Sequence, residues 1–393
     1  MKDTAYNKKA AIIRKFKNTQ IVSVDNFQLE NGCVLPEVDI AFETYGTLNK
    51  TQDNAILVCH ALTGSAHVAD YKGNNGYPVD KQDSQLDPLV KNAAESTGWW
   101  DALIGPGRPL DTNRYFVICS NILGSCYGTT GPTSLNPETG EQYAGNFPDI
   151  SVRDMVQLQK RLLDFLDVQK LELIIGGSLG GMQVLEWAVL YPDCVRKIIP
   201  IATATQHSAW AISLNEAARL AIKNDPQWKN GFYKEQPADG LALARIMAMI
   251  SYRSHPSYQQ RQGRNPAQNK KHDVDIFTHT QPEYAIQSYL HYQGQKLVQR
   301  FDANSYLSIT QAMDRHDLAR GRISLNKALG SIKARALCIG IDSDVLYPAF
   351  EQRQIAQAID GAQYAEIKST HGHDAFLIEF EQIQKMVTDF INS

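Results

Sequence analysis

The sequence predicts an α/β protein in which a mostly parallel central sheet is covered by helices on both faces and interrupted by a helical insertion. Short apolar runs alternate with stretches of helical periodicity along much of the chain. Strands buried on both faces read as continuous apolar runs, because neither face carries polar side chains. One such run ends in Gly176-x-Ser178-x-Gly180, a strand-to-helix turn, and a long stretch further on is almost purely helical in pattern.

The apolar runs and the helical patterns follow one another in the order that parallel pairing requires. Runs typical of strands are Ala55–Val58, Tyr115–Cys119, Leu171–Ile175, Val195–Ile201, Ala336–Ile341 and Tyr364–Ile367. Helical spacing is found in Val152–Leu166 and Met182–Tyr191, and an amphipathic helix over Ala375–Ile391 closes the chain. Strands that alternate with helices of this length favour a parallel sheet.

The alternation stops between about residues 206 and 325. Periodic segments within this stretch are Leu214–Ile222, Ala238–Tyr252, Ile286–Phe301 and Ser305–Met313. We therefore expect a core domain of residues 1–205 and 326–393 and a helical lid domain of residues 206–325, lying over the carboxyl edge of the sheet. Residues 70–97 and 258–271 are rich in polar residues, glycine or proline and are expected to be loops.

The composition limits the class of protein. The chain has 393 residues, 43% of them hydrophobic, and a net charge of −3, which argues against disorder and against a nucleic-acid or membrane-surface partner. The polar, basic N-terminus has no apolar core of a secretion signal. Six cysteines without a C-x-x-C spacing indicate a reduced, cytoplasmic protein, and no spacing of ligands predicts a metal site.

Ser178 carries the main chemical hypothesis. A serine at the apex of a strand–turn–helix unit is held in a strained conformation that exposes its hydroxyl above the sheet edge. Gly176 and Gly180 are expected because a Cβ at either position would collide across the turn. The alternative is a glycine-rich turn in which the serine only caps the helix.

A nucleophilic serine needs a base within hydrogen-bond reach, and the base needs an orienting carboxylate. Two strand ends after Ser178 offer them. We favour Asp344 over Asp342, which immediately follows its strand and is suited to capping the loop. We favour His373 over His371, because His373 follows Gly372, whose flexibility would let a tight turn aim the ring at the sheet edge.

The developing oxyanion needs backbone donors. The amide of Leu179, next to the serine, is the first candidate, and the amide of Leu62 in the loop after Ala55–Val58 is the second. His60 precedes the serine and is expected to support this loop. Five further histidines are expected to be surface or satisfied core residues: His207, His255, His272, His279 and His291.

Several longer segments make a more specific match. They are His60–Gly64, Gly98-Trp-Trp-Asp101, Ile104–Arg108, Gly124–Pro132, Gly176–Gln183, Arg300–Tyr306, Asp344-Val-Leu-Tyr-Pro348 and Gly372–Leu377. On these segments the chain resembles the homoserine O-acyltransferase family of the α/β-hydrolase superfamily, from about residue 26 to the C-terminus. The resemblance implies the α/β-hydrolase fold and a triad of Ser178, Asp344 and His373.

The resemblance also implies a substrate site. Arg245, Tyr252 and Asp374 would hold the amino-acid substrate, with Thr63 nearby. A guanidinium can pair with a carboxylate through two parallel hydrogen bonds. Without the resemblance, Arg245 would be read as an exposed helix cation and Asp374 as a helix cap.

The implied activity is transfer of the acetyl group of acetyl-CoA to the hydroxyl of L-homoserine through an acyl-serine, in methionine biosynthesis. Acetyl-CoA would be a co-substrate and no cofactor would be bound. The implied partners are small molecules and a second copy of the chain, paired through the lid helices. The alternatives are a succinyltransferase acting on homoserine or serine, a serine esterase or thioesterase, and a non-enzymatic binding protein on the same fold.

Overall fold

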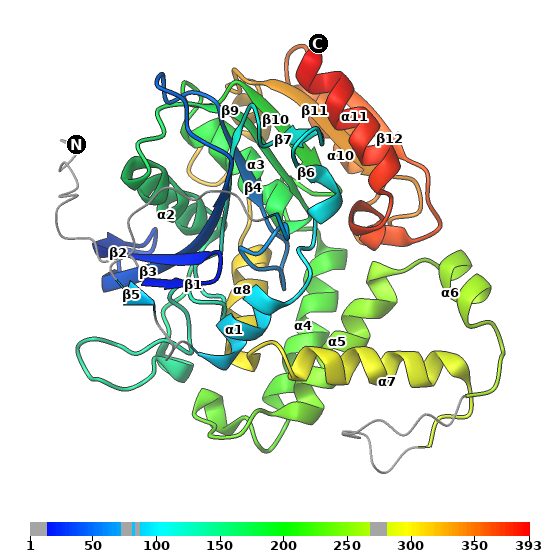
Figure 1. The fold of residues 1–393 in the computed structure, drawn as a ribbon. Helices are drawn as coiled ribbons and strands as arrows, with labels where there is room; N and C mark the ends of the chain where they lie inside the picture. Colours follow the sequence, from blue (N-terminus) through cyan, green and yellow to red (C-terminus); the bar gives the residue numbers. More distant parts are fainter. Residues whose placement is uncertain (1–13, 72–80, 83–86, 268–280) are drawn as a thin grey trace.

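The computed structural model of the chain describes residues 14–71, 81–82, 87–267 and 281–393, and its centre is one large twisted sheet (Figure 1). The strands are β1 (Arg14–Phe16), β2 (Thr19–Gln28), β3 (Val34–Tyr45), β4 (Ala55–Cys59), β5 (Lys81–Gln82), β8 (Phe116–Ser120), β9 (Leu171–Gly177), β10 (Lys197–Ile201), β11 (Arg335–Ile341) and β12 (Gln363–Ile367). Their order across the sheet is β12-β11-β10-β9-β4-β8-β3-β2-β1-β5.

Six neighbouring strands, from β12 to β8, run parallel to one another. Leu57 of β4 lies opposite Ile118 of β8 on one side and Ile174 of β9 on the other. The strands β3, β2 and β1 extend the sheet by antiparallel pairing. The predicted mostly parallel central sheet is therefore confirmed, and its carboxyl ends gather at one edge.

Both faces of the sheet are buried, which explains the continuous apolar runs. Along β4, Leu57 packs into one core with α2 (Val152–Phe165), α3 (Leu179–Leu190) and α10 (Ala349–Ala358). Ile56 and Val58 face the opposite core, which includes Trp100 and α11 (Phe380–Asn392).

The chain between β10 and β11 is helical. It forms α4 (Ala209–Lys223), α5 (Ala238–Tyr252), α6 (His255–Arg261), α7 (Ala285–Val298), α8 (Ala303–Asp314) and α9 (Leu325–Leu329), and its described part adds no strand to the large sheet. In Figure 1, α4, α5 and α7 lie together below the sheet. The division into two domains at residues 205 and 326 stays a prediction. Among the described residues, no helix is long and apolar enough to cross a membrane.

Two stretches expected to be loops contain helices. Residues 88–95 form α1 (Pro88–Glu95), whose first turn is capped by the side chain of Asp87 and begins with a proline. Ser254 caps α6 in the same way, so residues 258–261 are helical. Both are short helices with a clear N-terminal signal but little apolar periodicity. The rest of these loop assignments falls partly on residues 72–80, 83–86 and 268–280, outside the described residues, as do His272 and His279.

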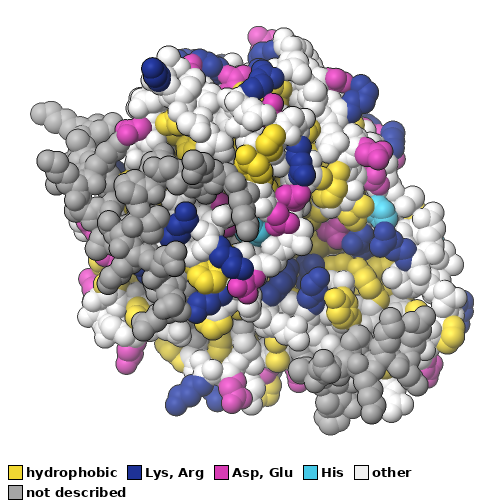
Figure 2. Space-filling model, in the orientation of Figure 1, with side chains coloured by type: hydrophobic (Ala, Val, Ile, Leu, Met, Phe, Trp, Pro, Cys, Tyr) yellow, Lys and Arg dark blue, Asp and Glu magenta, His cyan; other side chains and the backbone are white. Residues whose placement is uncertain are grey.

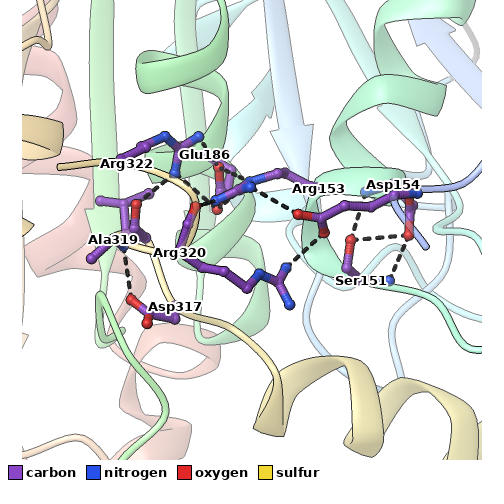
Figure 3. A network of polar contacts seen from close by, with 10 residues as sticks. Ser151, Arg153, Asp154, Glu186, Asp317, Ala319, Arg320 and Arg322 are labelled. Atoms are coloured by element: carbon purple, nitrogen blue, oxygen red, sulfur yellow. Dashed lines mark hydrogen bonds and ion pairs between the residues drawn. The ribbon is translucent and has the colours of Figure 1, made fainter. Parts of the chain in front are cut away.

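An ion-pair network fixes the point where the chain returns from the helical insertion to the sheet (Figure 3). Glu186 of α3, almost fully buried, binds Arg322 at 2.7 Å and Arg153 at 3.3 Å. Glu30 binds Arg153 at 2.8 Å and Arg320 at 2.6 Å. A buried carboxylate that keeps two cationic partners is compensated, so this network holds residues 320–322 against α2 and α3.

Candidate active site

Ser178 occupies a sharp turn between β9 and α3. Its φ of 58° and ψ of −125° are a strained combination for a residue with a side chain. A Cβ at Gly180 would lie 2.2 Å from the carbonyl oxygen of Cys59, and one at Gly176 would lie 2.6 Å from the same atom. Only glycine therefore allows the turn to approach the end of β4. Ser178 stands at the N-cap of α3 but its side chain makes no capping hydrogen bond, contrary to the capping alternative.

Asp344 and His373 form a buried pair at the carboxyl edge of the sheet. Asp344 follows β11, and His373 lies in a short 3₁₀ turn after β12, with Nδ1 2.7 Å from Oδ2 of Asp344. The other oxygen of Asp344 accepts the amides of Leu346 at 2.8 Å and Tyr347 at 3.0 Å. Because a carboxylate can only accept, the proton of His373 lies on Nδ1 and its Nε2 can accept one.

The competing residues lie elsewhere. Asp342 accepts the amide of Ser369 at 3.0 Å and so closes the loop between two strand ends, as the alternative for this residue expected. His371 is partly exposed, and burial together with the nearby Arg261 lowers its pKa. The structure brings Asp344 and His373 together, with Ser178 lining the same cavity as His373.

The charge state of His373 is set by opposing effects. Burial disfavours the imidazolium and acts to lower the pKa, but the carboxylate of Asp344, its hydrogen bond and the charge of Asp374 outweigh it. The net result is a His373 pKa above its usual value. A histidine with a raised pKa accepts a proton readily as a general base and can then donate it to a leaving group as a general acid.

The two candidate oxyanion donors lie where the chain approaches Ser178. Leu62 lines the cavity, and Leu179 directly follows the serine. Within the described residues neither amide has an acceptor. His60 holds the Leu62 loop: its Nδ1 donates to the carbonyl of Ala61 at 2.8 Å, and its Nε2 accepts the amide of Ile122 at 3.1 Å. Burial lowers the pKa of His60 to about 4, so the ring is neutral and acts as a support.

The cavity has a volume of about 430 Å³ and contains the residues expected to bind substrate. Arg245, Tyr252 and Asp374 line it together with Ser178 and His373. The guanidinium carbon of Arg245 lies 5.5 Å from the centre of the Tyr252 ring, and no carboxylate in the described part of the chain pairs with it. Figure 2 shows lysine and arginine side chains in the band between the sheet and the helices below it.

Two arginines of the site were not found from the sequence. Arg300 donates to the carbonyl oxygen of Thr63 at 2.9 Å, to its hydroxyl at 3.0 Å and to the hydroxyl of Tyr127 at 3.0 Å. Thr63 therefore lies in the cavity wall, held by Arg300. Arg253 pairs with Asp374 at 3.1 Å. Arg300 opens one of the segments that carry the resemblance, which was a usable signal, whereas nothing local to Arg253 indicates its partner.

No group of three or more metal-ligating side chains occurs among the described residues. The arrangement offers a serine at a strained turn, a histidine–carboxylate pair, two backbone amides without acceptors among the described residues, and a cation and an anion within one cavity. These are the parts of an acyl-transfer site that uses a covalent intermediate.

Comparison with known proteins defines the class first. The family model described as the alpha/beta hydrolase fold matches residues 54–380, so the chain belongs to that fold family.

Relatives within the fold narrow the assignment. The chain is 49% identical to the homoserine O-acetyltransferase of Trichormus variabilis, over 93% of this chain and 92% of the relative. A crystal structure of homoserine O-acetyltransferase from Bacillus anthracis superposes with a TM-score of 0.82 at 30% identity, covering 97% of this chain and 98% of that one. The chain belongs to the homoserine O-acetyltransferase family. The structure of esterase E22 is also similar, with a TM-score of 0.80 at 28% identity, covering 95% of this chain and 99% of that one.

Proposed function

We propose that this protein transfers the acetyl group of acetyl-CoA to the γ-hydroxyl of L-homoserine, giving O-acetyl-L-homoserine and coenzyme A, as a step of methionine biosynthesis. One observation carries the proposal beyond family membership. The cavity that holds Ser178 and His373 also holds the carboxylate of Asp374 and the guanidinium of Arg245, which pairs with no carboxylate of the described residues. A cation and an anion in one cavity complement the two charges of an amino acid.

In the first half-reaction, Nε2 of His373 takes the proton of the Ser178 hydroxyl, whose oxygen attacks the thioester carbonyl. The carbonyl oxygen becomes negative, and the amides of Leu62 and Leu179 stabilise it. The carbon–sulfur bond breaks, and the imidazolium gives its proton to the departing thiolate. Asp344 holds the ring in the required orientation and stabilises its charged form.

In the second half-reaction, homoserine enters with its carboxylate on Arg245 and its ammonium near Asp374. His373 removes the proton of the γ-hydroxyl, the hydroxyl oxygen attacks the acetyl-serine, and the serine leaves with the proton from His373. Tyr252 stacks on Arg245 and so limits the positions that its guanidinium can take. Exclusion of water during this step favours transfer over hydrolysis.

Hydrolysis is the second candidate, because esterase E22 shares the fold at a TM-score of 0.80. The same serine, histidine and aspartate would serve an esterase, with water in place of homoserine. The presence of both Arg245 and Asp374 in the cavity distinguishes the two functions, since an esterase has no need to bind an amino acid.

We further propose that the protein is a cytoplasmic homodimer assembled through the lid helices. The support is a set of large apolar side chains left exposed on α4 and α5: Trp210, Leu220, Leu243 and Ile250. Exposed apolar side chains gathered on neighbouring helices are typical of a protein interface. Light scattering of the purified protein and of Trp210→Glu tests this, with a dimer expected for the first and a monomer for the second. A wild-type monomer would rule it out.

Release of free coenzyme A tests the reaction. Acetyl-CoA and succinyl-CoA are each combined with L-homoserine, L-serine or no amino acid, and Ser178→Ala serves as the control. We expect rapid release only with acetyl-CoA and homoserine. Preference for succinyl-CoA or serine would reassign the substrate, and equal release without an amino acid would replace the transferase by a thioesterase.

A further inference from the structure

A series of hydrogen-bonded polar side chains, most of them buried, lies behind the Asp344–His373 pair. The hydroxyl of Tyr347 is 2.9 Å from Nε2 of His207, and Nδ1 of His207 is 3.0 Å from Oδ1 of Asp314. Oδ2 of Asp314 is 2.6 Å from Nη2 of Arg219. The side chains of Tyr347 and His207 are almost completely shielded from solvent.

The direction of these hydrogen bonds follows from chemistry. The carboxylate of Asp314 can only accept, so Nδ1 of His207 carries a proton. Burial, followed by the nearby Tyr252 and Asp344, raises the pKa of Tyr347 well above its usual value, so its hydroxyl keeps its proton. The hydroxyl of Tyr347 is therefore available as a donor toward Nε2 of His207.

Tyr347 contacts both the acid and the base of the site. Its backbone amide donates to Oδ1 of Asp344 at 3.0 Å, and the centre of its ring lies 5.2 Å from the centre of the His373 ring. Tyr347 is completely buried. A displacement of this one residue would therefore move the carboxylate and the imidazole together.

The far end of the chain of contacts belongs to the helical insertion. Arg219 lies on α4 and Asp314 on α8, and Asn215 of α4 also donates to Oδ1 of Asp314 at 2.8 Å. His207 follows β10 and Tyr347 follows β11. Three side chains converge on Asp314, from His207, Asn215 and Arg219, so a shift of α4 or α8 would break several of these contacts at once.

We propose that Tyr347, held by His207 and Asp314, is a positioning residue for the Asp344–His373 pair, and that α4 fixes this position through Arg219. The inference rests on the proposed function for its catalytic meaning. Under this proposal, the helical insertion helps to hold His373 in position relative to Ser178.

The variant Tyr347→Phe tests the proposal, because it removes the hydroxyl and leaves the ring against His373. The matched control is Tyr364→Phe, which removes a hydroxyl bonded to Glu366 at 2.6 Å, away from the cavity. Three quantities are measured: kcat and KM for acetyl transfer, the rate at which a fluorophosphonate labels Ser178, and the thermal midpoint of unfolding.

We expect Tyr347→Phe to lower kcat and the labelling rate by about tenfold, since small displacements of a catalytic base are costly, and to leave the KM for homoserine unchanged. Tyr364→Phe is expected to change neither rate. The labelling rate reports the activated serine without any acyl donor, so it distinguishes failure of this inference from failure of the proposed substrates.

A kcat and a labelling rate within about twofold of the wild type would overturn the proposal, since no misplacement of the base would have occurred. A fall in thermal midpoint with unchanged rates would also overturn it and leave a purely structural network. If Tyr347→Phe does not fold, Asp314→Asn acts one bond further away and must show the same loss of kcat, in smaller measure, at unchanged KM.

Discussion

Two aspartate–histidine pairs flank Tyr347, and one of them faces the cavity. Nδ1 of His373 lies 2.7 Å from Asp344, and Nδ1 of His207 lies 3.0 Å from Asp314. The pairs differ at the other ring nitrogen. Nε2 of His207 is filled by the hydroxyl of Tyr347, whereas His373 lines the cavity beside Ser178. An aspartate–histidine pair therefore acts as a general base only where the second nitrogen remains open to a nucleophile.

The two carboxylates also differ in their partners. Burial acts to raise the pKa of Asp314, but hydrogen bonds from His207, Asn215 and Arg219 outweigh it and the net pKa is lowered. Its charge is shared with an arginine. Asp344 accepts only backbone amides besides His373 among the described residues. His373 is therefore the only side chain among the described residues that forms a hydrogen bond with Asp344.

The largest expected effect follows from replacing the histidine of each pair, because only His373 is expected to act as a base. His373→Gln should lower kcat/KM for acetyl transfer by about four orders of magnitude or more, because no group remains to take the serine proton. His207→Gln, the matched change, should lower it by about tenfold, since an amide can still bond Tyr347. Equal losses in steady-state kinetics of the two variants would break the comparison.

The next effect concerns the carboxylate and has a signature in pH. Asp344→Asn should lower kcat by about three orders of magnitude while the fold persists. The wild-type kcat/KM should rise with pH through a midpoint above 6.5, because His373 acts as a base only when neutral and its pKa is raised. The variant loses the charge that raises it, so its midpoint should move down. A pH–rate profile with an unshifted midpoint would show that Asp344 does not set the basicity of His373.

The raised pKa of His373 has a consequence for stability with the opposite sign. A group that binds its proton more tightly when folded stabilises the fold fully below its unfolded pKa of 6.5, and this contribution is lost as pH rises through the folded pKa. If His373 is the general base, activity is expected to be highest where His373 contributes least to stability.

A smaller effect concerns the proposed amino-acid site, which distinguishes acetyl transfer from hydrolysis. Arg245→Leu should lower kcat/KM for homoserine by about 10- to 100-fold, the value of charge-assisted hydrogen bonds to a carboxylate, and leave formation of the acetyl-enzyme unchanged. The control is Arg264→Leu, which removes an exposed arginine that stacks 5.1 Å above Tyr284 in the same way but outside the cavity. Burst kinetics with acetyl-CoA separate the two steps. An equal loss in both steps would remove Arg245 from the substrate site.

The smallest effect comes from a histidine that cannot act as a base. Both nitrogens of His60 are bonded to the backbone, and burial lowers its pKa to about 4. The stability that the neutral ring contributes is complete above pH 6.5 and is lost as pH falls towards 4. At pH 5 the loss in free energy of unfolding is about 2 kcal/mol. His60→Gln should remove that part of the loss, measured by urea unfolding at pH 7 and pH 5, with the exposed His255→Gln as control. Identical pH dependence in the two variants would contradict this account of His60.

Local patterns in the sequence were sufficient to predict much of the structure. The parallel sheet follows from apolar runs, and the turn at Ser178 follows from its two glycines, each of which faces the Cys59 carbonyl. The choice of Asp344 over Asp342 rested on the position of each residue relative to a strand end, and the structure pairs Asp344 with His373. In each case the signal that permits the prediction lies within a few residues of the sequence, although the contacts themselves join distant segments.

Contacts between segments that are distant in the sequence could not be predicted from such local patterns. His207 was expected to be a surface or satisfied core residue, and the structure makes it the satisfied centre of a network, but nothing near it in the sequence indicates Asp314 or Tyr347. The pairing of Arg253 with Asp374 was missed for the same reason. Such contacts depend on how whole helices and loops pack against one another. The periodicity of a single sequence does not indicate which of them become neighbours.

The most direct test of the central claim is to identify the covalent state of Ser178. The protein is mixed with acetyl-CoA alone, digested and analysed by peptide mass spectrometry, and then treated with homoserine before a second analysis. The account predicts one acetyl group on the peptide that contains Ser178, removed by homoserine with formation of O-acetylhomoserine. An unmodified Ser178 together with full transferase activity would contradict it.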